Sequence, residues 1–131
     1  MAGAPPLVKS FLIADQVFQE ASGKWYVLGV FTRLRASQFP VLAKSLGLFV
    51  ILADAEGAFH VRVECCDAAD RVVSVFDGID LTVRSRLDTV HIGFQAHDLT
   101  IPAPGKYFFK LHFNGVVVPS EISIVAELRT P

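Results

Sequence analysis

The sequence predicts an all-β protein, a two-sheet antiparallel β-sandwich of about eight strands that is immunoglobulin-like in a broad sense. Three observations predict this fold class. The chain holds 17 Val, 7 Ile and 11 Phe, and β-branched and aromatic residues favour a pleated, half-buried surface. Turn-forming residues recur every 10–15 residues or so, a spacing typical of sandwiches and barrels. No segment has the period of a long amphipathic helix.

The length, charge and N-terminal residues of the chain indicate a single domain that neither binds nucleic acid nor enters a membrane. A chain of 131 residues fits a single domain, expected to span residues 1–131, because domains cluster at about 100–150 residues. The formal net charge of -1 argues against a surface that neutralises phosphates, so no nucleic-acid partner is expected. The apolar run at 11–14 closes on Asp15, which is too short for a secretory signal or a membrane span. We therefore expect a cytoplasmic bacterial protein without membrane insertion.

The expected strands alternate with turns along the whole chain. They cover residues 7–17, 25–34, 46–53, 58–66, 71–84, 89–98, 106–113 and 116–129. Pro40 favours a single helical turn or a loop within 39–46, because proline is tolerated in a first turn. The pair Asp77-Gly78 predicts a bulge, and Asn114-Gly115 predicts a hairpin with a type I′ turn. Tyr107, after Pro104-Gly105, resembles a tyrosine corner.

Alternation of apolar and polar residues predicts which side chains form the core. The expected core residues of the four clearest strands are Phe59, Val61, Val63 and Cys65; Val90, Ile92, Phe94 and Ala96; Tyr107, Phe109, Leu111 and Phe113; and Val118, Ile122, Ile124, Ala126 and Leu128.

Two strands are apolar on both faces, which leads to the hypothesis of self-association. With glycine counted and tyrosine left out, about 57% of the chain is apolar, above the roughly 45–50% of average domains. A sandwich has one core, so a loop, the N-terminal segment or a second copy must cover the other face. The simpler alternative is a central strand beneath the loop at 35–45. The predicted interface residues are Trp25, Val27, Phe31, Phe49 and Ile51.

The titratable residues predict no metal site and no catalytic site. His60, His91, His97 and His112 are all expected on outward faces. His91 would lie opposite His112 if their strands formed a hairpin, but zinc normally takes three or four ligands. The carboxylates lie in turns at opposite ends of strands, which scatters them, so no calcium site is expected. We expect no cofactor.

The remaining reactive side chains also favour a non-enzymatic protein. Cys65 and Cys66 are adjacent and are expected to be free thiols in a reducing compartment. No nucleophile motif or phosphate-binding glycine loop occurs. Arg33, Arg35, Arg84 and Arg86 would form an anion-binding patch only if their strand ends met, and solvated strand ends are the preferred interpretation.

Four short motifs occur in a characteristic order: Ala14-Asp15, Gly29-Val30-Phe31, Phe39-Pro40 and Pro104-Gly105-Lys106-Tyr107. In this order they resemble an uncharacterised family of small, single-domain bacterial β-sandwich proteins. The resemblance covers nearly the whole chain. It implies no activity, ligand or catalytic residue, because that family has none assigned.

The functional prediction is therefore a non-enzymatic protein–protein interaction or structural module that forms a homo-oligomer through an apolar sheet face. The alternative is a ligand-binding module of a carbohydrate-binding kind, which would need an exposed aromatic platform flanked by polar groups. A small metal- or anion-dependent enzyme is the least favoured class.

Overall fold

The structure, a computed structural model, describes residues 6–97 and 99–129. These residues form strands and no helix, so the prediction of an all-β fold is confirmed. The described residues therefore contain no helix that could span a membrane. The strands are β1 (Leu7–Gln19), β2 (Trp25–Val30), β3 (Arg33–Ala36), β4 (Val41–Ala43), β5 (Leu46–Ala53), β6 (Gly57–Cys66), β7 (Val72–Val83), β8 (Val90–Ala96), β9 (Leu99–Ile101), β10 (Gly105–Phe113) and β11 (Val116–Leu128).

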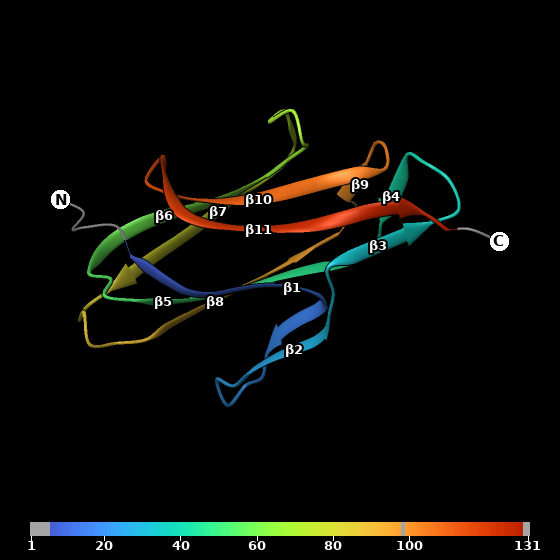
Figure 1. The fold of residues 1–131 in the computed structure, drawn as a ribbon. Coiled ribbons are helices and arrows are strands. Elements are labelled where there is room, and N and C mark those ends of the chain that lie inside the picture. The colour runs from blue at the N-terminus through green and yellow to red at the C-terminus, as the bar shows by residue number, and fades with distance from the viewer. Residues whose placement is uncertain (1–5, 98, 130–131) are drawn as a thin grey trace.

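The described strands form three sheets. The strand order is β2-β1-β5-β8 in the first sheet and β3-β11-β10-β6-β7 in the second, and β4 pairs with β9 in a two-stranded third sheet. Figure 1 shows β6, β10 and β11 above β1, β5 and β8, with the β2 hairpin projecting below the lower layer. The larger sheets are antiparallel apart from the parallel pairing of β3 with β11.

The expected number of eight strands in two sheets is wrong for the described residues, which form eleven strands in three sheets. The expected strand at 25–34 divides, because the chain leaves the first sheet after Val30 and joins the second at Arg33. The segment at 39–46 forms β4 rather than a helical turn, with a cis peptide bond before Pro40. The expected strand at 89–98 ends at Ala96, and Asp98 lies outside the described residues.

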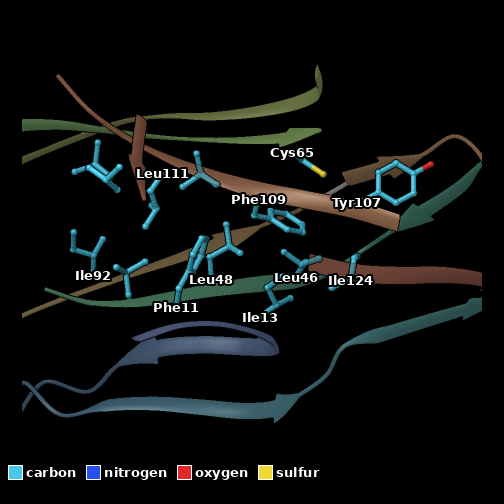
Figure 2. Close-up of a cluster of buried hydrophobic side chains, with 14 of the residues drawn as sticks. Phe11, Ile13, Leu46, Leu48, Cys65, Ile92, Tyr107, Phe109, Leu111 and Ile124 are labelled. Atoms are coloured by element: carbon cyan, nitrogen blue, oxygen red, sulfur yellow. The ribbon is translucent and has the colours of Figure 1, made fainter. Parts of the chain in front are cut away.

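The main core lies between the two larger sheets. Phe11, Ile13, Leu48 and Ile92 from the first sheet pack in one cluster with side chains of the second sheet, and Figure 2 shows the two sets directed toward one another. The predicted core faces of β6 and β10 are confirmed, since their odd-numbered residues from Phe59 to Cys65 and from Tyr107 to Phe113 are all buried.

Two predicted turn features are confirmed by the backbone. Asn114 and Gly115 have φ values of 52° and 81°, and a type I′ turn requires positive φ at both central residues. In β7, Phe76 pairs with Val63 and Ile79 pairs with Val61, so β7 carries one extra residue at Asp77-Gly78. This is a β-bulge.

Tyr107 forms the predicted tyrosine corner. Its side chain is buried, and its hydroxyl donates a hydrogen bond of 2.7 Å to the carbonyl of Ala103. The Ala103 N–H lies 3.3 Å from the same hydroxyl oxygen and donates to it. The hydroxyl therefore satisfies both backbone groups of a residue that lies between two prolines.

We expect Tyr107→Phe to lower the free energy of unfolding by about 1–3 kcal/mol, because two hydrogen bonds to the Ala103 backbone are lost, each worth about 0.5–1.5 kcal/mol. Urea denaturation measures the change. Tyr26→Phe is the matched control. Tyr26 is partly exposed, and removal of its hydroxyl should lower the free energy of unfolding by less than about 0.5 kcal/mol. Equal effects of the two variants would contradict a structural role for the Tyr107 hydroxyl.

Candidate functional site

A bend in β1 determines where Trp25 and Val27, two of the predicted interface residues, lie in the fold. Through Ala14, β1 pairs with β5, and from Gln16 onward it pairs only with β2. Gly29 lies opposite the bend with a φ of 74°, and a Cβ there would come within 2.4 Å of the Asp15 carboxylate. Glycine suits this backbone conformation, which L side chains rarely adopt, and any Cβ would also displace the Asp15 carboxylate. The last residues of β1 therefore leave the plane of the sheet together with β2, and the two strands form a hairpin.

Gln95 on β8 holds this hairpin against the sheet. Its Oε1 accepts a hydrogen bond of 2.8 Å from the N–H of Val17. Val17 lies beyond Ala14, where the pairing of β1 with β5 ends. Its Nε2 donates to the Asp15 carbonyl at 3.1 Å and to Ser45 Oγ at 2.6 Å. One side chain thus replaces the sheet hydrogen bonds that β1 gives up at the bend.

The hairpin covers the outer face of β5 and β8 and forms a second apolar cluster there. Ala14, Val17 and Phe49 are its buried members, and Leu12, Trp25, Val27 and Ile51 pack around them. The centroids of the Trp25 and Phe49 rings lie 5.9 Å apart.

Two strand glycines make room for the hairpin. A Cβ on Gly47 would approach Val17 Cγ2 to 2.6 Å, and one on Gly93 would approach Trp25 Cζ3 to 2.2 Å. An isolated glycine inside a strand often marks such a close approach, so Gly47 and Gly93 are the signal in the sequence for this contact.

Four of the five predicted interface residues lie together in this second cluster: Trp25, Val27, Phe49 and Ile51. Phe31 does not join them and packs against the main core. The reason is the turn of the chain at Gly29, after which β3 belongs to the other sheet, so alternation along 25–34 does not hold. The chain's own hairpin covers much of the face that was expected to need a partner.

The outer side of the hairpin carries an exposed apolar strip, defined here as Phe18, Tyr26, Leu28 and Val30. Phe18 stacks on Tyr26 with ring centroids 5.2 Å apart. Phe18, Leu28 and Val30 are 44%, 47% and 57% exposed. None of the four residues of the strip is among the predicted interface residues.

We expect Gln95→Ala to lower the free energy of unfolding by about 1–3 kcal/mol, because the Val17 N–H loses its acceptor. Urea denaturation followed by tryptophan fluorescence suits this test, because Trp25 is the only tryptophan in the sequence. Gln16→Ala is the control, since Gln16 is exposed on the same hairpin. A Gln95→Ala variant as stable as the control would refute the role given to Gln95.

Two hollows meet at Trp25. The larger, of about 520 Å³, lies between the tip of the hairpin, the end of β7 and the start of β8, and includes Gln19, Arg84, Asp88 and His91 in its lining. The second, of about 480 Å³, shares Gly23, Trp25 and His91 with the first.

Three of the four histidines lie in different surroundings, and the fourth, His97, is exposed. His91 on β8 stacks on Phe49, with ring centroids 5.9 Å apart, whereas His112 is on β10 in the other larger sheet. The two strands form no hairpin, so His91 and His112 are not a cross-strand pair. His112 is buried rather than solvated, and its Nε2 lies 2.8 Å from Glu64 Oε1. That contact lacks the alignment of a hydrogen bond, and no described group bonds to His112 Nδ1.

His60 is held between two carboxylates. Its Nδ1 lies 2.8 Å from Asp80 Oδ1 and its Nε2 lies 2.6 Å from Asp77 Oδ1. The extra residue of the β7 bulge sits at Asp77-Gly78, within this cluster. The hydrogen bonds to Asp80 and Asp77 raise the pKa of His60 above its ordinary value of 6.5. The bond to His60 in turn lowers the pKa of Asp77.

The His60 cluster gives stability with a defined pH dependence. A histidine with a raised folded-state pKa stabilises fully below its unfolded pKa of 6.5, and this contribution disappears as the pH rises through the folded pKa. We therefore expect His60→Gln to lower the melting temperature more at pH 5.5 than at pH 9. In NMR titrations, Asp80→Asn should lower the pKa of His60, whereas Asp54→Asn in the turn before β6 should not. A His60 pKa unchanged by Asp80→Asn would disprove this pairing.

The other polar candidates are dispersed. Arg33 and Arg35 both pair with Glu127, at 3.1 and 2.8 Å, on β3 at one edge of the five-stranded sheet. Arg84 follows β7, which is at the opposite edge, so these strand ends do not meet and the less favoured interpretation, an arginine patch, does not apply. Among residues 6–97 and 99–129, no group of three or more His, Cys, Asp and Glu side chains is placed to hold a metal ion.

The two cysteines are free and buried. Cys65 lies in the main core, where burial raises the pKa of its thiol to about 12. Burial also raises the pKa of Cys66, which lies on the opposite face of β6. Both thiols are therefore protonated at neutral pH and are poor nucleophiles.

The fold and this site define an all-β protein whose edge hairpin folds over the outer face of one sheet. The sequence profile of a family of unknown function (DUF6941) matches residues 9–125. The chain belongs to this family, which agrees with the resemblance drawn from its short motifs. No protein of curated function matches the sequence.

Proposed function

We propose that the protein is a non-enzymatic interaction module that self-associates through the apolar strip on the outer side of the β1–β2 hairpin. The observation that carries the proposal is the strip itself. Phe18, Leu28 and Val30 are each about half exposed. Phe18 pairs with Tyr26 across the hairpin, and Leu28 and Val30 follow Tyr26 at alternate positions on β2. Contiguous exposed apolar surface marks interaction sites more often than isolated apolar residues do.

A second copy of the chain fits this surface because β2 is also a sheet edge. Among the described strands, β2 pairs only with β1, so one row of its backbone groups lies outside the ladder. Exposed sheet edges recruit further strands. Antiparallel pairing of β2 with β2 of a second copy places Leu28 of each copy near the other strip. Such a contact is self-complementary, as a twofold dimer requires.

The two larger sheets serve in this proposal as a sandwich scaffold, immunoglobulin-like in a broad sense, that presents the hairpin. We place the module in the cytoplasm. The free, unpaired state of Cys65 and Cys66 supports a reducing compartment, because secreted small domains commonly use cysteines in disulfides.

The proposal predicts that charges within the strip separate the copies. We expect Phe18→Lys/Leu28→Lys to change the molar mass in light scattering from a multiple of 14.3 kDa to 14.3 kDa, because the four ammonium groups of the pair would lie on one joined face and repel one another. Val75→Lys is the matched control, since Val75 is 47% exposed on β7, outside the strip.

Circular dichroism shows whether each variant keeps its strands, so loss of association is separated from loss of fold. A wild-type protein that stays at 14.3 kDa up to millimolar concentration would rule out self-association. A folded double variant with the wild-type mass would rule out the strip as the interface.

A further inference from the structure

Two open hollows form a shallow groove at the tip of the hairpin. Its two hollows, of about 520 and 480 Å³, are each within the range of about 300–1,000 Å³ that small-molecule sites occupy. Trp25 and His91 line both hollows, so a ligand of more than one ring can extend from one into the other. The apolar strip used for self-association lies on the opposite side of the hairpin.

Arg84 and Asp88 indicate what kind of ligand the groove takes. Both line the larger hollow, yet they form no ion pair with each other or with any other described side chain. Arginine only donates hydrogen bonds and an ionised aspartate only accepts them. A hydroxyl group does both, so a neutral polyhydroxylated ligand satisfies both side chains. Asp88 would repel an anion, and an apolar ligand would desolvate both charges without replacing their hydrogen bonds.

Trp25 supplies the apolar part of the site. Its indole is partly exposed and is fixed in place by Gly93 beneath it and by the Phe49 ring 5.9 Å away. An aromatic side chain held in this way offers a large apolar contact area and loses little freedom when a ligand binds. The C–H face of a pyranose ring is a matching surface, since it is apolar while the ring's edge carries hydroxyls.

We infer that this groove binds a neutral oligosaccharide, with one sugar ring against Trp25 and its hydroxyls bonded to Arg84 and Asp88. This arrangement is the aromatic platform flanked by polar groups that the alternative functional prediction required. The inference does not depend on self-association, because its residues lie outside the apolar strip.

Binding is tested with the full chain and defined probes: cellohexaose, laminarihexaose, chitohexaose and xylohexaose, followed by a printed glycan array. The fluorescence of Trp25, the only tryptophan in the sequence, reports occupancy, and calorimetry gives Kd. We expect at least one neutral glycan to bind. Arg84→Gln and Asp88→Asn should each weaken its binding tenfold or more, because a charged hydrogen bond is lost.

Arg86→Gln is the matched control, because Arg86 lies on the same exposed turn but not in the lining of either hollow. Its Kd should stay within twofold of the wild-type value. All three substitutions are at exposed positions, and thermal melts verify that each variant folds. The inference is overturned if no neutral glycan binds the wild-type protein, if only acidic glycans bind, or if Arg84→Gln and Asp88→Asn bind as the control does. Light scattering on the same samples tests self-association separately.

Discussion

The bend of β1 after Ala14 is the constraint on which the distinctive parts of this structure depend. By leaving β5 there, the chain gives up sheet hydrogen bonds, and an unpaired buried N–H costs about 1–3 kcal/mol. Gln95 removes that cost at Val17. Burial of an aromatic side chain the size of Phe49 contributes about 1.5–3 kcal/mol. Apolar burial under the hairpin therefore favours the bend, and Gln95 fixes where it occurs.

This arrangement accounts for much of the apolar excess of the sequence. A two-layer domain has one core, but here the hairpin adds a second cluster around Phe49 on the outer face of the sheet. The hairpin itself has two faces, and its outer one holds Phe18 and Leu28 in the exposed strip. The hairpin thus covers the apolar outer face of the sheet, but its own outer side is apolar and exposed.

The alternation of apolar and polar residues predicted correctly which side chains face inward along a single straight strand. It did not predict contacts between residues that are distant in the sequence. The inward residues of β6 and β10 follow from period two alone, and they were predicted correctly. Phe31 was predicted to share a face with Trp25, because the hydrophobic pattern does not reveal the turn at Gly29 that ends the alternation. Gln95 was not singled out, since its partner Val17 is 78 residues away. His112 was placed in solvent because its partner Glu64 lies on a neighbouring strand.

The geometry of β2 limits how far association through its edge can extend. The strand has six residues, and Gly29, with its φ of 74°, interrupts regular strand geometry near its end. Short and irregular edge strands disfavour open-ended sheet growth. Pairing of two such edges uses the free edge of both β2 strands, so a third copy finds no equivalent surface. The same features that fold the hairpin over the sheet thereby favour a closed pair over a fibre.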